Sequence, residues 1–201
     1  QTVWHQADKY KVPRICFINK LDRMGASFEN SFRSIQERLN PNAVAIQLPI
    51  GIEANFEGAI DLIEMKAFNF ESEHGEKIVV KEIPENLKKE AEKYRHILLE
   101  KIVERDENLM AKYLDEQEIP QDELRRVLRK ATIENKLIPV LCGSALKNKG
   151  IQLVLDAVLD YLPSPLDLAE LKPVKGANPK TDEEIIRQPK DEEPFTALAF
   201  K

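Results

Sequence analysis

Residues 12–22 read VPRICFINKLD, an apolar run that ends abruptly in polar residues. The apolar part, 12–18, has the length and continuous hydrophobicity of a strand buried on both faces of a parallel sheet. The pattern recurs at 137–150, where the apolar run LIPVLC leads into the polar loop GSALKNKG. A helical pattern follows each loop. These two strand–loop–helix units predict the tail of an open α/β sheet, in which ligands bind at the carboxyl ends of the strands.

The two helices of these units are predicted from apolar residues at helical spacing. The first begins after Gly25 and ends before Asn40-Pro41, because proline disfavours helix at the residue before it. The second ends at Pro163 and is predicted to turn these residues inward: Ile151, Val154, Leu155, Val158 and Leu159.

Residues 43–135 have a different pattern, typical of an α+β module inserted between the two units. Three or four strands are predicted, over 44–50, 59–63 with 67–70, and 78–80, punctuated by glycines. From Pro84 onward the spacing is helical, and two apolar faces are predicted: Leu87, Ala91, Tyr94, Leu98 and Ile102, and Leu124, Val127, Leu128 and Ala131. Residues 166–193 are rich in Pro, Lys, Asp and Glu and predict a linker, and 194–201 alternate like the first strand of a further β domain.

The composition excludes some kinds of partner and site. Lysine and arginine total 30 against 35 aspartates and glutamates, and the formal net charge of −5 argues against direct binding to bare nucleic acid. No apolar run reaches the roughly 18 residues of a membrane span, so no membrane partner is expected. Cys16 and Cys142 lie in strand-like runs and are expected to be reduced thiols. The three histidines have no metal-ligand spacing and are expected at the surface.

Asn19-Lys20-Leu21-Asp22 contains the side chains needed to recognise guanine. The Asp22 carboxylate can accept both the N1–H and the N2 amino group, and adenine, which lacks both donors, would leave it buried and unpaired. We expect Asn19 to fix the loop and reach the N7 edge, and Lys20 to lay its methylene stem over the base. We expect Leu21 to anchor the loop in the core. The alternative is a polar loop in which Asp22 only caps the following helix.

Gly143-Ser144-Ala145-Leu146 follows the second strand and is predicted to complete the site. The backbone N–H of Ala145 is expected to donate to the guanine O6, where adenine carries a donor instead. The Ser144 hydroxyl is expected to tie this loop to the first one. The predicted base-binding residues are Asn19, Lys20, Asp22, Ser144, Ala145 and Leu146, and no catalytic residue or metal ligand is predicted in this chain.

These two loops resemble the fourth and fifth guanine-nucleotide motifs of translational GTPases. Residues 2–10, 47–51, 142–150 and 160–165 are similar to elongation factor G, and the resemblance covers essentially the whole chain, least clearly 166–193. Small GTPases place the motifs far closer together, whereas elongation factor G carries an inserted subdomain between them.

The resemblance implies an α/β fold that contains the last two strand–helix units of a P-loop-type GTPase sheet, with an inserted α+β subdomain. The implied organisation is a GTP-binding domain at 1–42 and 136–165, the inserted subdomain at 43–135, a linker at 166–193, and the first strand of a following β-barrel domain at 194–201.

The family implies a ribosome-dependent GTPase that uses GTP and Mg²⁺ to drive tRNA and mRNA translocation. The implied partners are the ribosome, including its stalk protein through the inserted subdomain, and tRNA and mRNA indirectly through other domains of a monomeric protein. The sequence contains no G-x-x-x-x-G-K-[ST] motif and no switch histidine, and both ends look cut from a longer protein. We therefore expect this fragment alone neither to hydrolyse GTP nor to hold Mg²⁺.

Single residues favour an organellar member of the family. Leu146 stands where bacterial forms commonly have Phe, and residues 19–25 are similar to the mitochondrial translocase. Residues 4–9 are similar instead to the mitochondrial ribosome-releasing paralogue, so translocation ranks first and recycling second. The expected location is the mitochondrial matrix, with the bacterial cytoplasm as the alternative.

The acidic helical stretch from Glu82 to Glu123 has two interpretations. It is either a solvated helix face or the surface that docks on the stalk protein. An alternative hypothesis for the function is that the chain is a non-catalytic interaction module. In that case the base-reading loops are vestigial. An adenine-specific kinase is disfavoured, because both loops suit guanine.

Overall fold

The computed structural model describes residues 2–71, 75–167, 174–178, 181–188, 190, 192–195 and 197. The chain divides into two compact units, Gln1–Leu162 and Pro163–Lys201. The first unit carries both predicted loops, and the second is described separately below.

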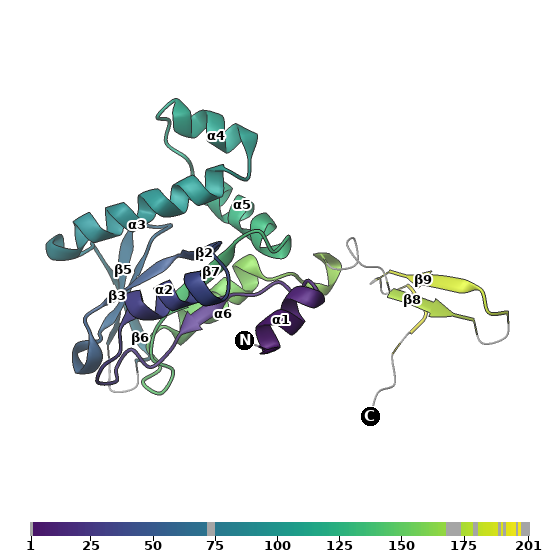
Figure 1. The fold of residues 1–201 in the computed structure, drawn as a ribbon, viewed down its shortest axis with the longest axis horizontal. Coiled ribbons are helices and arrows are strands. Elements are labelled where there is room, and N and C mark those ends of the chain that lie inside the picture. The colour runs from purple at the N-terminus through teal and green to yellow at the C-terminus, as the bar shows by residue number, and fades with distance from the viewer. Residues whose placement is uncertain are drawn as a thin grey trace. The chain divides into compact units, whose positions relative to one another are not determined.

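A parallel sheet of three strands forms the part of the first unit that positions the loops (Figure 1). Its central strand is β7 (Ile138–Cys142), and β1 (Cys16–Ile18) and β2 (Ala43–Ala45) pair with it on either side. β1 runs parallel to β7, as the two apolar runs predicted, and β2 also runs parallel to it. All five residues of β7 are buried, which explains the absence of polar residues in that strand.

An antiparallel sheet of four strands follows in consecutive order. It contains β3 (Gln47–Ile50), β4 (Gly58–Asp61), β5 (Lys66–Glu71) and β6 (Lys77–Lys81). A 3₁₀ turn, η1 (Glu53–Asn55), connects β3 to β4. The strands predicted between 44 and 80 are thereby confirmed, except that the first of them is divided.

The predicted strand 44–50 is two strands that belong to different sheets, and Ile46 is the residue where the chain changes sheet. Its N–H donates to Val140 O in the parallel sheet at 3.0 Å, and its carbonyl accepts the Leu62 N–H beside the antiparallel sheet at 2.9 Å. The expected boundary at residue 43 is therefore wrong, because Ala43–Ala45 complete the parallel sheet. The alternation of apolar residues gave no sign of this division.

The helices of the first unit are α1 (Thr2–Lys9), α2 (Phe28–Arg38), α3 (Glu85–Val103), α4 (Glu107–Leu114), α5 (Gln121–Ile133) and α6 (Ile151–Tyr161). The apolar faces predicted for α3 and α5 point into the core. Sequence analysis missed α4, which begins at Asp106, whose carboxylate accepts the N–H groups of Asn108 and Leu109 at 3.1 Å. Figure 1 shows α4 on the side of α3 and α5 that faces away from the sheets.

The face predicted to be buried in α6 is wrong in part, since Val154 packs against the core but Leu155, Val158 and Leu159 are exposed. Ala157 and Tyr161 are its buried residues, whereas Leu155 and Leu159 are 61% and 77% exposed. Apolar residues lie on more than one side of this helix, so their spacing alone does not select the inward face.

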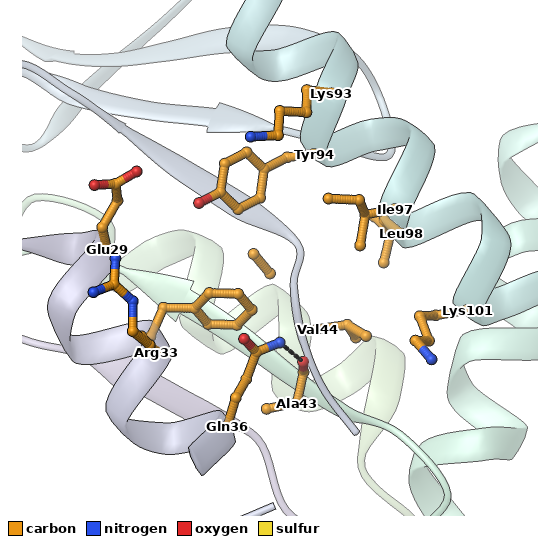
Figure 2. A pocket seen from close by; sticks show the side chains of 12 residues that line it. Glu29, Arg33, Gln36, Ala43, Val44, Lys93, Tyr94, Ile97, Leu98 and Lys101 are labelled. Atoms are coloured by element: carbon orange, nitrogen blue, oxygen red, sulfur yellow. Dashed lines mark hydrogen bonds between the residues drawn. The ribbon is translucent and has the colours of Figure 1, made fainter. Parts of the chain in front are cut away.

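One hydrophobic core joins the inserted residues to the parallel sheet. At this junction α3 lies opposite α2, and the rings of Phe32 and Tyr94 are 6.4 Å apart. Figure 2 shows the hollow of about 330 Å³ between them, where the Gln36 side chain donates to Ala43 O at 3.0 Å. The insert is therefore packed against the sheet as part of one compact unit.

In the second unit the structure contains a hairpin of β8 (Val174–Ala177) and β9 (Glu184–Arg187). Its strands lie inside 166–193, so the expected linker is wrong in part, because these residues pair with one another. Among 194–201, residues 194, 195 and 197 are described and lie in no strand. The remainder of that predicted strand lies outside the described residues. Across the described part of the chain, no helix combines the length and the apolarity needed to cross a membrane.

We expect Leu128→Ala to lower the free energy of unfolding by about 2–5 kcal/mol, because this side chain is fully buried in α5. Urea unfolding followed by circular dichroism measures the change. Leu114→Ala is the matched control, since Leu114 is 72% exposed and its loss should cost less than about 0.5 kcal/mol. Equal losses in the two variants would contradict the assigned core.

Candidate guanine-binding loops

The two predicted loops begin side by side at the same edge of the parallel sheet. Ile18, the last residue of β1, lies opposite Cys142, the last residue of β7. The Gly143 N–H donates to Ile18 O at 3.0 Å, and the Leu21 N–H donates to Gly143 O at 3.2 Å. The backbones of the two loops are thus fixed to one another directly after the strands end.

Side chains join the loops a second time. The Ser144 hydroxyl donates to Asp22 Oδ1 at 2.6 Å, which confirms the predicted tie between the loops. The Ala145 N–H donates to Asn19 Oδ1 at 2.9 Å. Four of the six predicted residues are therefore joined in two hydrogen-bonded pairs. The members of each pair are more than 120 positions apart in sequence.

The Ala145 N–H donates to the Asn19 side chain in the structure. Its expected bond to the guanine O6 stays a prediction. Asn19 Oδ1 also accepts the Lys20 N–H at 2.7 Å, so this one oxygen holds both loops. These two bonds agree with the predicted role of Asn19 in fixing the loop, and its contact with the N7 edge stays a prediction.

The first loop turns sharply at Lys20, which has a φ of 64° in the left-handed region. This turn leaves the Lys20 side chain exposed and directs Leu21 into the core, where it is 5% exposed. The predicted anchoring role of Leu21 is confirmed. Leu146, the last predicted residue, is 75% exposed.

Asp22 does not cap the following helix, so that alternative is wrong. The N-cap of α2 is Ser27, whose hydroxyl accepts the Asn30 N–H at 3.2 Å. The Ser144 hydroxyl is the main cause that lowers the pKa of Asp22, and the charges of Arg23 and Lys147 lower it further. The Asp22 carboxylate is therefore ionised at neutral pH and can act only as an acceptor, as contact with two donors of guanine requires.

Two residues that sequence analysis left out support the second loop. A side chain at Gly143 would lie 2.4 Å from the Lys149 carbonyl oxygen, so only glycine fits there. Gln47 is buried, and its Oε1 accepts the Cys142 N–H at 3.3 Å at the end of β7. In the sequence, the only indication that Gln47 supports the loop is that it is a polar residue in an otherwise apolar strand.

The remaining chemical groups do not form a second site in the described part of the chain. Cys16 and Cys142 are free thiols, as expected. His5 and His96 are exposed, and His74 lies outside the described residues. Among the described residues no group of three or more His, Cys, Asp or Glu side chains is arranged to hold a metal ion.

Comparison with known proteins gives one consistent family. Residues 1–164 match the model of the elongation factor Tu GTP binding domain. Elongation factor G of Thermotoga maritima is 54% identical over 201 residues, all of this chain and 29% of that protein. Elongation factor G of Thermotoga neapolitana is also 54% identical over the whole chain, which covers 28% of that protein.

A solved structure shares the fold. The crystal structure of ttk003000868 from Thermus thermophilus has a TM-score of 0.73 and 28% sequence identity, over 82% of this chain and 24% of that one. The chain thus spans less than a third of the length of each of these three relatives.

We expect Ser144→Ala to raise the pKa of Asp22 toward its ordinary value of 3.8, because the main hydrogen bond to the carboxylate is lost. Carboxyl-carbon NMR titration measures this pKa. Ser34→Ala, a half-buried serine on α2, is the control and should leave it unchanged.

The hydrogen bond from Ser144 to Asp22 also makes the free energy of unfolding depend on pH. Asp22 has a lower pKa in the folded chain, so its stabilisation is complete above about pH 3.8 and is lost as the pH falls through the folded-state value. The stability difference between wild type and Ser144→Ala should narrow on acidification. A difference that grows at low pH would contradict this account.

Proposed function

Because this chain belongs to the elongation factor Tu GTP-binding domain family, we propose that it is the guanine-recognising part of a ribosome-dependent GTPase that drives tRNA and mRNA translocation. The observation that supports guanine recognition most directly is the Ser144–Asp22 hydrogen bond of 2.6 Å, which brings the two loops together. Similarity to elongation factor G over the whole chain supports translocation.

In this proposal, each loop contributes to base selection. The ionised Asp22 carboxylate accepts the N1–H and the N2 amino group of guanine, while Ser144 holds that carboxylate in place. The Ala145 N–H, which donates to Asn19 Oδ1 in the structure, exchanges that acceptor for the guanine O6 when the base binds. Lys20 is exposed beside them and covers the base with its methylene stem. Adenine would offer Asp22 neither the N1–H nor the N2 amino donor, and would present a donor to the Ala145 N–H.

GTP hydrolysis belongs to the full-length protein in this proposal. When bound, GTP supplies the transferable phosphoryl group and Mg²⁺ neutralises charge on it. The sequence of this chain contains no G-x-x-x-x-G-K-[ST] motif, and its described residues have no cluster suited to a metal ion. We propose that phosphate and Mg²⁺ are held elsewhere in the protein and that the chain alone is inactive.

For the location we propose the bacterial cytoplasm and a monomeric factor. The 54% identity to elongation factor G of two Thermotoga species supports a bacterial type of factor. The mitochondrial matrix, and with it the recycling paralogue, stays a prediction based on Leu146 and residues 4–9 and 19–25.

We also propose that the acidic side of α3 docks on the ribosomal stalk protein, as the family resemblance implies. Glu100 lies on this helix and Glu104 directly follows its last residue, and about half of each side chain is exposed. Their ion pairs on the helix are long. Glu100 Oε1 is 3.4 Å from His96 Nε2, and Glu104 Oε2 is 3.9 Å from Lys101 Nζ. Such surface pairs contribute little to stability, so both carboxylates remain available to a basic partner.

Asp22→Asn in the full-length protein should shift preference from GTP toward XTP, because an amide can donate to the O2 of xanthine and no longer accepts two donors. We expect guanine affinity to fall by at least about a hundredfold, as for loss of a buried polar contact. Competition binding with GTP, XTP and ATP measures the shift. Asp122→Asn on α5, an exposed position, is the matched control. An unchanged base preference would favour the alternative hypothesis that the chain is a non-catalytic interaction module.

Reversing the charges of Glu100 and Glu104 to lysine should slow ribosome-stimulated GTP hydrolysis several-fold, because like charges would then face the stalk protein. Intrinsic GTP binding should remain at the wild-type level. Glu37→Lys combined with Glu57→Lys, at positions on other elements, controls for net charge. If the ribosome stimulates GTP hydrolysis equally in the wild type and in the Glu100/Glu104 variant, the acidic stretch is only a solvated helix face.

A further inference from the structure

The turn between β3 and β4 contacts both guanine-binding loops. Glu53 Oε1 accepts the Gly25 N–H at 2.7 Å, and Gly25 lies three residues after Asp22 in the first loop. The Phe56 carbonyl accepts a hydrogen bond from Lys149 Nζ at 2.6 Å, and Lys149 lies in the second loop. A short segment of the insert, 53–56, is therefore bonded to each loop.

This turn is itself held firmly. Gly51 has a φ of 80°, and a side chain there would lie 1.9 Å from the Asn55 carbonyl oxygen. The Asn55 N–H donates to Ile52 O at 2.9 Å, and the buried Phe56 donates its N–H to Glu53 O at 3.0 Å. The two groups that reach the loops thus come from a segment fixed by its own hydrogen bonds and by the core.

The contact to the first loop depends on Glu53. This residue has a φ of 50°, in a region that residues other than glycine rarely adopt. At Gly25, an added side chain would meet no atom within 4 Å. The hydrogen bond from the Gly25 N–H to the Glu53 carboxylate adds a contact from outside the loop to the loop's own bond from the Ala26 N–H to Arg23 O at 3.0 Å.

The contact to the second loop leads directly to the base-reading residues. Lys149 exchanges two backbone hydrogen bonds with Ser144, at 2.9 and 3.0 Å. Ser144 in turn donates its hydroxyl to Asp22. The position of the half-buried Lys149 therefore determines the position of Ser144, and through it that of the carboxylate that faces guanine.

We propose that Glu53 and Lys149 are positioning residues through which the inserted subdomain sets the affinity and selectivity of the guanine site. Neither side chain touches the base; together they fix the two loops relative to each other before nucleotide binds. Such preorganisation raises affinity by removing the cost of ordering the loops on binding. This inference rests on the proposed guanine-binding function.

The test uses the full-length protein and fluorescent GDP in stopped-flow dissociation measurements. We expect Glu53→Ala and Lys149→Met each to speed GDP release about tenfold, the effect of one charge-assisted hydrogen bond. The ratio of GDP to IDP affinity should fall as well, because IDP lacks the N2 amino group that a misplaced Asp22 reads less well. A loss of folded protein alone would not change that ratio.

Conservative and distant variants serve as controls. Glu53→Gln keeps an acceptor oxygen and Lys149→Arg keeps a charged donor, so both should release GDP at nearly the wild-type rate. Glu57→Ala, in the exposed position after the turn, and Lys130→Met on α5 should match wild type. Amide hydrogen exchange without nucleotide should be faster over 19–26 in Glu53→Ala and over 143–150 in Lys149→Met.

The outcomes separate this inference from the proposed function. If wild type binds GDP and Asp22→Asn changes base preference, but Glu53→Ala and Lys149→Met leave release, selectivity and exchange unchanged, the positioning role is overturned alone. If wild-type full-length protein does not bind GDP, the proposed function fails and the inference fails with it. Faster release with a lower GDP to IDP ratio, restored by the conservative variants, supports the inference.

Discussion

The parallel pairing of β1 with β7 is the constraint on which the rest of the site depends. Because Ile18 lies opposite Cys142, two loops from distant parts of the chain begin side by side at the carboxyl ends of adjacent strands. From there Ser144 reaches Asp22, and Ala145 reaches Asn19. A register shifted by one residue would turn the strand side chains to the opposite face and separate these partners.

The insert completes this arrangement because it is built into the sheet. The chain leaves β1 through α2, adds β2 beside β7, and changes sheet at Ile46. The core is continuous from the parallel sheet to α3 and α5, so the insert cannot move freely against the loops. In the proposed function this continuity connects a surface that docks on the ribosome to the residues that hold the nucleotide.

Much of the fold followed from the sequence, since buried parallel strands have continuous apolar runs and helices have a 3.6-residue period. The loops were predictable for a similar reason: their polar residues directly follow such runs. What failed depended on tertiary context. Residues 44–50 form one apolar run but belong to two sheets, and α6 is apolar on more than one side. The role of Gln47 arises from a contact between segments far apart in sequence, which no local pattern reports.

The central claim is that both loops contact one guanine base. A crystal structure of the full-length protein with bound GDP tests it most directly. The account predicts Asp22 oxygens about 2.7–3.1 Å from both N1 and N2 and the Ala145 nitrogen at a similar distance from O6. A base bound elsewhere, or one that contacts a single loop while Asp22 faces solvent, would contradict it.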